Sequence, residues 1–355
     1  MSISNQMHIY IISPSYFKTG GTKSLHQLAD ILAASGFDVS MIYCEKGDLV
    51  KKDSMLYEFC RAKMTDPEEI LDDVNSIILV PEIFTGILKR FKKSKKIVWW
   101  LSLDFFLSDP LSSAKRTMHK KNLPQILLPI MILYKRAIGG YSFDQISTPE
   151  EFSEIYHLYN CEYVRSFLIQ HGAVEEKMRY LCGPLENDYL HLLEEAEEII
   201  HHKEDMIAYN PAKMNLTYLK KLKKDVLRRN GDIKFVAIEN MTKEDVQNTL
   251  RKSKVYLDFG YFPGPERMPR EAAMLQCNII TSKLGSAANS VDVPIPAEYK
   301  FDLNKAGLNR ISDKILELIN NYETYICDFD IYRRKITEQI TSFENDIFEV
   351  FEEML

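Results

Sequence analysis

Short runs of apolar residues recur along the whole chain, each bounded by polar residues, glycine or proline. Runs of this kind are typical of strands that are buried on both faces of a parallel sheet. In the first half of the chain, the predicted strands are His8–Ile12, Asp38–Cys44, Ser76–Val80, Lys96–Leu101, Gln145–Thr148 and Tyr163–Leu168. In the second half, they are Met206–Tyr209, Lys234–Ile238, Val255–Phe259 and Asn278–Thr281.

The segments between these runs have the periodicity of amphipathic helices. From Lys23 to Ser35, apolar residues recur at helical spacing, and Gly36 follows as a C-terminal cap. Leu216–Arg229 predicts a basic amphipathic helix, Thr242 begins a capping box, and Arg270–Leu275 begins another helix. Strands that alternate with helices predict parallel sheets with right-handed crossovers.

The two series of strands predict an α/β chain with two doubly wound, Rossmann-like domains that face each other across a cleft. We place the N-terminal domain at 1–180 and the C-terminal domain at 181–335. A chain of 355 residues is long enough for two such cores. Residues 336–355 predict a C-terminal helix that crosses back to the N-terminal domain.

Composition narrows the class of protein. The formal net charge of -6 argues against a nucleic-acid-binding protein, which usually carries a basic excess. None of the six cysteines forms a Cys-x-x-Cys pair, so we expect a reducing compartment and no structural zinc. Residues 1–8 lack the order of a secretion signal, which favours a cytoplasmic location.

The segment Phe262–Ala273 carries the strongest functional signal. It follows a predicted buried strand, opens a helix, and contains three prolines, two acids and two arginines. A stiff, charged loop at the carboxyl end of a strand suits a binding site. The alternative is a rigid turn in which Glu271 only stabilises the helix dipole.

This segment resembles the C-terminal domain of GT-B-fold glycosyltransferases, especially the large retaining group with a Glu-x7-Glu motif. The resemblance implies that Glu271 hydrogen-bonds the ribose of a nucleotide-sugar donor. The first Glu of the motif is absent, because Pro263 stands at its position. Glu266 is the nearest acid and is our candidate for the missing catalytic-site carboxylate.

Other donor-side residues follow from the same resemblance. Lys213 is our candidate for neutralising the diphosphate, with Arg267 or Arg270 as support. The loop formed by Gly285, Ser286, Ala287, Ala288 and Asn289 resembles the one near the donor diphosphate or sugar. Gly20 and Gly21, after the first strand, resemble the glycines that make room for the sugar or phosphates. The alternative is that Lys213 is an ordinary surface lysine and that the glycine-containing loops are turns without a binding role.

On the acceptor side, Asp104 follows the strand that ends at Leu101 and is a candidate general base or acceptor ligand. Its alternative is a turn-capping acid beside core aromatic residues. No Asp-x-Asp follows a predicted strand, so we expect no metal and no cofactor besides the donor. Residues 115–136 combine basic residues with an apolar segment, which predicts peripheral contact with an anionic membrane or, alternatively, a buried helix.

These features together predict a hexosyltransferase-like glycosyltransferase that moves a sugar from a nucleotide sugar to a saccharide or lipid-linked acceptor. We expect it in bacterial surface polysaccharide synthesis, in the cytoplasm at the inner face of the membrane. Two alternatives stay open: a nucleotide-sugar epimerase of the same fold, and a non-catalytic GT-B scaffold protein. An NAD-dependent enzyme is disfavoured because the chain lacks Gly-x-Gly-x-x-Gly.

Overall fold

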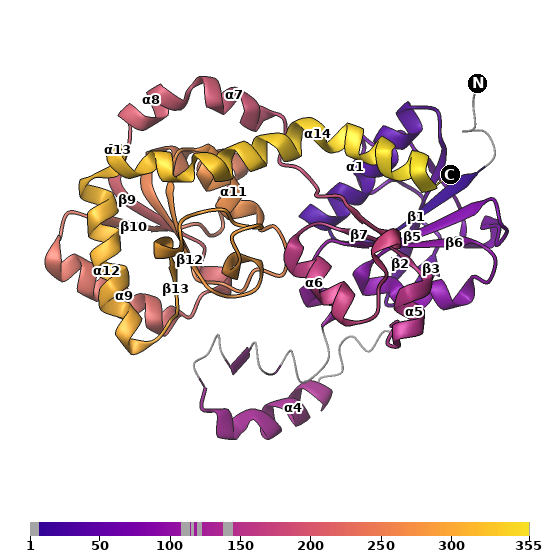
Figure 1. The fold of residues 1–355 in the computed structure, drawn as a ribbon, viewed down its shortest axis with the longest axis horizontal. Helices are drawn as coiled ribbons and strands as arrows, with labels where there is room; N and C mark the ends of the chain where they lie inside the picture. The colour runs from indigo at the N-terminus through magenta and orange to yellow at the C-terminus, as the bar shows by residue number, and fades with distance from the viewer. Residues whose placement is uncertain (1–6, 108–113, 115–116, 119–122, 138–144, 355) are drawn as a thin grey trace. The chain divides into compact units, whose positions relative to one another are not determined.

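The computed structural model describes residues 7–107, 114, 117–118, 123–137 and 145–354. The chain forms two compact units. Among the described residues, the first unit draws on Met1–Asp109, Gly139–Pro184 and Ser342–Leu355, and the second on Pro110–Ile138 and Leu185–Thr341. Each unit has its own sheet with helices packed around it (Figure 1).

The sheet of the first unit has the order β3-β2-β1-β5-β6-β7-β8, with β4 paired to β2. All pairs are parallel except β2 with β3. Its strands are β1 (His8–Pro14), β2 (Asp38–Glu45), β3 (Asp48–Val50), β4 (Lys63–Met64), β5 (Ser76–Pro81), β6 (Lys95–Trp100), β7 (Tyr156–Tyr159) and β8 (Met178–Tyr180). The inner strands β1, β5 and β6 are almost entirely buried, as their apolar runs predicted.

The main helices of the first unit are α1 (Gly20–Ala34), α2 (Leu103–Phe106), α5 (Pro149–Glu154) and α6 (Glu162–Gln170). The prediction of a strand at Tyr163–Leu168 is wrong, because these residues lie inside α6. Val164 and Leu168 are buried at helical spacing, which matches one face of a helix. The prediction of a strand at Gln145–Thr148 is also wrong: Thr148 caps α5, and the next strand is β7.

The second unit has a wholly parallel sheet with the order β10-β9-β11-β12-β13. Its strands are β9 (Glu204–Tyr209), β10 (Lys234–Ala237), β11 (Ser253–Asp258), β12 (Asn278–Ser282) and β13 (Lys300–Phe301). Its helices are α4 (Leu128–Ala137), α7 (Asp188–Glu194), α8 (Ala196–His201), α9 (Leu216–Arg229), α10 (Lys243–Lys252), α11 (Arg267–Met274), α12 (Lys305–Asn320) and α13 (Tyr322–Tyr325). Thr242 forms the predicted capping box with Asp245.

Short 3-10 helices complete the two units. They are η2 (Pro67–Glu69), η3 (Glu82–Arg90), η4 (Gln125–Leu127), η5 (Glu175–Lys177), η6 (Pro211–Lys213), η7 (Ser286–Ala288), η8 (Ala297–Tyr299) and η9 (Ile326–Phe329). In the described part of the chain, no helix combines the length and the apolar character that crossing a bilayer requires.

The last helix, α14 (Asp330–Met354), contributes to two hydrophobic cores. Tyr332 and Ile336 from its first part are buried in the core of the second unit. Phe343 and Phe351 from its last part are buried with α1 and the strands of the first unit. The Phe343 ring stacks on Trp99 with 6.4 Å between the ring centroids. One helix therefore takes part in the packing of both units.

Candidate functional site

The strand order of the second unit places its candidate site. The chain goes from β9 to one neighbour, β10, and then returns to the other side of β9 to form β11. In parallel sheets, ligands bind at the carboxyl ends of the strands where the order reverses in this way. The segments that follow β9 and β11 are η6 and the loop that leads into α11. The segment singled out from the sequence, Phe262–Ala273, is therefore at the expected place.

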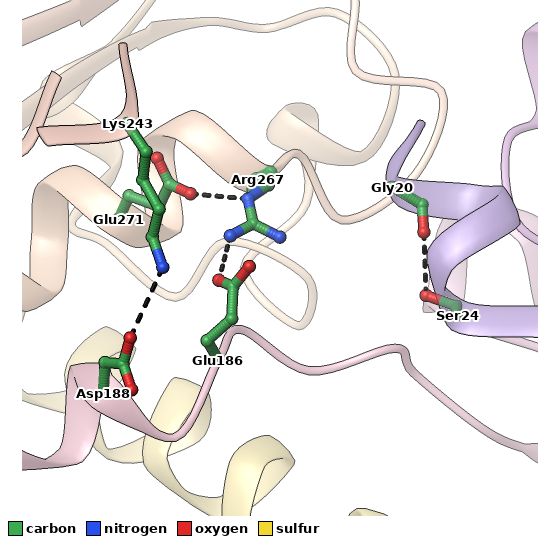
Figure 2. Close-up of polar contacts among 7 residues, drawn as sticks. All are labelled: Gly20, Ser24, Glu186, Asp188, Lys243, Arg267 and Glu271. Atoms are coloured by element: carbon green, nitrogen blue, oxygen red, sulfur yellow. Dashed lines mark hydrogen bonds and ion pairs between the residues drawn. The ribbon is translucent and has the colours of Figure 1, made fainter. Parts of the chain in front are cut away.

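The N-terminus of α11 carries an ion-pair network that crosses to the segment before α7 (Figure 2). Arg267 is the first residue of α11, and its Nε donates to Oε1 of Glu271 over 2.5 Å. A second nitrogen of the same guanidinium donates to Oε2 of Glu186. Asp188, two residues further on, pairs with Lys243 at 3.4 Å. The structure thus brings Arg267 and Glu271 together and adds Glu186.

The side chain of Glu271 is almost fully buried, at 7% exposure. Burial raises its pKa above the ordinary value, and this effect outweighs the Arg267 guanidinium, which lowers it. The negative charge of Glu186 also raises the pKa of Glu271, while a hydrogen bond with Tyr189 lowers it. Tyr189 and Glu186 are therefore members of this cluster that the sequence patterns did not indicate.

The buried hydroxyl of Tyr256 contacts one acid and is influenced by the charges of two others. This hydroxyl donates to Oδ2 of Asp258 over 3.1 Å, and Oδ1 of Asp258 accepts the backbone N–H of Gly260 at 3.0 Å. Burial raises the pKa of Tyr256, and the charges of Asp258, Glu266 and Glu271 raise it further. Glu266 is the residue before α11, the helix that carries Glu271.

The Gly285 loop is joined to the Phe262 segment by hydrogen bonds. Ser286 N donates to Phe262 O at 2.9 Å, and Ser286 Oγ donates to Gly264 O at 2.8 Å. Gly285 has a φ of 65°, and a Cβ there would lie 2.1 Å from Phe262 O. Only glycine tolerates this conformation and this approach. The two donor-side loops predicted from the sequence are therefore adjacent.

Asn289 ends this loop and stabilises the next turn. Its Oδ1 accepts the backbone N–H groups of Val291 and Asp292, and its Nδ2 donates to Asp292. Lys300 donates to the carbonyls of Asn289 and Val293 at 2.6 and 2.7 Å. Burial lowers the pKa of Lys300 to about 8. Ala287, in the middle of the loop, is fully buried.

Arg270 and Lys213, two of the predicted donor-side cations, lie in different parts of the second unit. Arg270 is 6% exposed, and its guanidinium donates to Gln339 Oε1 and to the carbonyl of Pro265, both at 3.3 Å. Its contacts brace the Phe262 segment from the core side. Lys213 ends η6, directly after β9. The side chain of Lys213 lies outside the described residues.

In the first unit, Gly20 and Gly21 begin α1 behind an N-cap at Thr19. Thr19 and Thr22 form a capping box, and Ser24 Oγ donates to Gly20 O at 3.1 Å (Figure 2). A Cβ on Gly20 would have nothing within 4 Å, whereas one on Gly21 would contact Leu101 at 3.5 Å. Gly21 therefore packs beside the loop that follows β6, whereas Gly20 faces open space.

That loop is held from both sides. Leu101 N donates to Glu82 Oε2 at 2.9 Å, and Leu101 O accepts from Asn160 Nδ2 at 2.9 Å. Glu82 follows β5 and is 2% exposed, and burial raises its pKa to about 7. Asp104, the predicted acceptor-side residue, lies three residues after Leu101, in the first turn of α2. Glu82 was not indicated by the sequence patterns.

In the part of the chain that the structure describes, no group of three or more His, Cys, Asp or Glu side chains is arranged to hold a metal ion. The candidate donor site is built instead from the Arg267 network and the Gly285 loop. Glu271 can accept hydrogen bonds from hydroxyl groups, whereas the charge of Arg267 is already balanced by two carboxylates. This cluster therefore suits the hydroxyl-bearing part of a ligand.

Comparison with known proteins identifies the fold. No protein-family model matches the sequence, and no curated protein matches it. The chain is similar to sucrose-phosphate synthase from Thermosynechococcus elongatus, with a TM-score of 0.60 and 10% identity over 98% of this chain and 99% of that one. It is also similar to Anabaena HepE in complex with UDP, with a TM-score of 0.54 and 9% identity over 98% and 100%.

A third similar structure is WaaG, a glycosyltransferase of lipopolysaccharide biosynthesis, with a TM-score of 0.52 and 10% identity over 96% of this chain and 99% of that one. Each similarity extends over nearly the whole length of both chains. This agreement confirms the prediction of an α/β chain with two Rossmann-like domains. The protein therefore has the GT-B fold of glycosyltransferases.

Proposed function

We propose that the protein is a glycosyltransferase that transfers a hexosyl group from a nucleotide-sugar donor to a saccharide or lipid-linked acceptor. The observation that carries this proposal is the buried Glu271 in α11, on a GT-B fold, where the segment before the helix is hydrogen-bonded to the Gly285 loop. HepE, a protein of the same fold, is known in complex with UDP and with UDP-glucose. A nucleotide sugar is therefore the donor we propose.

The donor would be held by groups of the second unit. Glu271 would accept hydrogen bonds from the ribose hydroxyls, as the resemblance to the Glu-x7-Glu group implies. The backbone of the loop from Gly285 to Asn289 would face the diphosphate, with Lys213 as cationic support. Arg270 is not available for this role, because its buried guanidinium is bonded to Gln339 and Pro265. The departing nucleoside diphosphate gains negative charge in the transition state, so positive charge placed there lowers the barrier.

The reacting groups would be Glu266 on the donor side and Asp104 on the acceptor side. Glu266 directly precedes α11, the helix that carries Glu271, and is our candidate to replace the first Glu of the motif, where this chain has Pro263. Asp104 would orient or deprotonate the acceptor hydroxyl. The chain is expected to need no metal, because its own cations would balance the diphosphate.

We further propose that the acceptor is lipid-linked and that the protein works at the cytoplasmic face of the membrane, in surface polysaccharide synthesis. Ile126, Ile130 and Leu133, in and next to α4, are 84, 65 and 64% exposed. The sequence between Asp109 and Asp144 contains six Lys or Arg residues and no acid. An exposed apolar helix within a basic segment suits the surface of an anionic bilayer.

Vesicle flotation tests this surface. Wild-type protein should float with phosphatidylglycerol-containing vesicles and not with pure phosphatidylcholine. The double variant Ile130→Glu with Leu133→Glu should stay in the bottom fraction. Leu71→Glu is the matched control, because Leu71 is equally exposed, at 60%, but lies in the first unit. Equal flotation of the wild type and the double variant would exclude α4 as the contact.

A thermal-shift panel of nucleoside diphosphates and nucleotide sugars tests the function itself. A ligand that binds only the folded state raises the melting temperature, so the true donor and its diphosphate should stand out. Incubating the protein with that donor alone separates an epimerase, which would form an isomer, from a transferase. Binding without any transfer to membrane-derived acceptors would instead indicate a non-catalytic scaffold.

A further inference from the structure

Arg267 lies between two carboxylates that come from distant parts of the sequence. Glu271 is on the same helix face, one turn further along α11, whereas Glu186 is 81 residues away, just before α7. Figure 2 shows the guanidinium reaching Glu271 with one nitrogen and Glu186 with another. Helices α7 and α11 pack together, which holds the Glu186 segment beside Arg267.

Because Arg267 bonds both carboxylates, it occupies fewer of the acceptor positions of Glu271. A guanidinium facing a single carboxylate tends to bond both of its oxygens through two parallel N–H groups. Here Nε of Arg267 bonds Oε1 of Glu271, and a terminal nitrogen is drawn to Glu186 instead. A carboxylate has room for about four hydrogen bonds. With one from Arg267 and one from Tyr189, Glu271 keeps acceptor capacity for a ligand.

We infer that Glu186 is a positioning residue of the nucleotide site: it holds the Arg267 guanidinium away from a two-point contact with Glu271, so that Glu271 stays able to accept the ribose hydroxyls. The inference rests on the proposed function, because it takes Glu271 as the ribose ligand. Glu186 itself touches no substrate in this account. It acts only through Arg267.

Burial makes this arrangement effective. The side chains of Glu186, Arg267 and Glu271 are 19, 35 and 7% exposed, so water screens their mutual attraction only partly. Removing the charge of Glu186 leaves one buried carboxylate for one guanidinium. Arg267 would then close on Glu271 and compete with the nucleotide for the same oxygens.

A double-mutant cycle on the full-length protein tests the inference. Calorimetry measures the affinity for UDP, or for whichever nucleoside diphosphate the thermal-shift panel selects. Glu186→Gln should weaken binding by roughly five- to tenfold while leaving the melting temperature of the free protein nearly unchanged. In an Arg267→Met background, Glu186→Gln should have no further effect, because the competing guanidinium is gone.

The control is Asp188→Asn, which removes an exposed ion pair from the same segment. It should bind the diphosphate like the wild type. In turnover, Glu186→Gln should raise the KM for the nucleotide sugar and leave kcat within about twofold, since a uniform loss of binding changes only KM.

Two results would overturn the inference. One is wild-type affinity in Glu186→Gln; the other is an equal loss of affinity in both backgrounds, which a purely structural role of Glu186 would give. Failure of the proposed function looks different. In that case no diphosphate binds the wild type, or Glu271→Gln binds it as tightly as the wild type does.

Discussion

Replacing Gly285 by alanine should separate the two loops that form the candidate donor site. Gly285 has a φ of 65° and a ψ of −140°, a conformation that residues with a side chain rarely adopt. The new Cβ would lie 2.1 Å from Phe262 O and 2.8 Å from Phe262 C. These are backbone atoms, so a rotation of a side chain cannot relieve the overlap.

The loss of stability is the sum of the backbone strain and the hydrogen bonds that are broken. The backbone strain contributes about 1–3 kcal/mol. Moving the loop also breaks the hydrogen bonds from Ser286 to Phe262 O and Gly264 O, each worth about 1 kcal/mol. We therefore expect Gly285→Ala to lower the free energy of unfolding of the second unit by roughly 3–5 kcal/mol.

Urea denaturation followed by far-UV circular dichroism measures this loss. Tryptophan fluorescence is less suitable, because Trp99 and Trp100 both lie in the first unit. Gly231→Ala is the matched control: a Cβ there meets only Leu227 O, at 3.8 Å. It should change stability by less than about 1 kcal/mol. If the two variants had equal midpoints, the account of the loop contact would be refuted.

Three further predictions concern buried polar and apolar contacts. Burial raises the pKa of Glu82 from 4.5 to about 7. The folded protein should therefore lose up to about 3 kcal/mol of stability as the pH rises through this window. In urea titrations at pH 5 and pH 8, Glu82→Gln should show a smaller change of the free energy of unfolding with pH. The Lys203 ammonium donates to the carbonyls of Leu250, Ser253 and Leu275. Lys203→Met should therefore lower the free energy of unfolding by roughly 2–3 kcal/mol at neutral pH. Phe343→Ala should cost about 3–5 kcal/mol by calorimetric unfolding, because it leaves a cavity beside Trp99.

Local patterns predicted much of the fold. The strands β1, β5, β6 and β11 are buried on both faces, so their apolar runs stand out in the sequence. The bounds of α9 agree with its prediction because an asparagine caps its start and an amphipathic pattern runs to its end. By contrast, β7 is four residues long and includes His157, whose burial in the core no short-range pattern indicates.

Some residues of the candidate site were also predicted from local patterns, and others were missed. Glu271, Arg267 and Gly285 were predicted because they belong to segments that directly follow predicted strands, although α11 begins at Arg267, three residues before its predicted start at Arg270. Glu186 was missed because its contact with Arg267 spans 81 residues of sequence. Glu82 was missed for a similar reason, since its hydrogen bond to Leu101 joins the ends of two different strands. Such contacts arise only from the strand order.

The most direct test is a crystal structure of the protein with its preferred nucleoside diphosphate. The ribose hydroxyls should lie within hydrogen-bonding distance, about 3 Å, of the Glu271 carboxylate. The diphosphate should face the loop that begins at Gly285. A nucleotide bound elsewhere, with Glu271 still enclosed by Arg267, would contradict the proposed donor site.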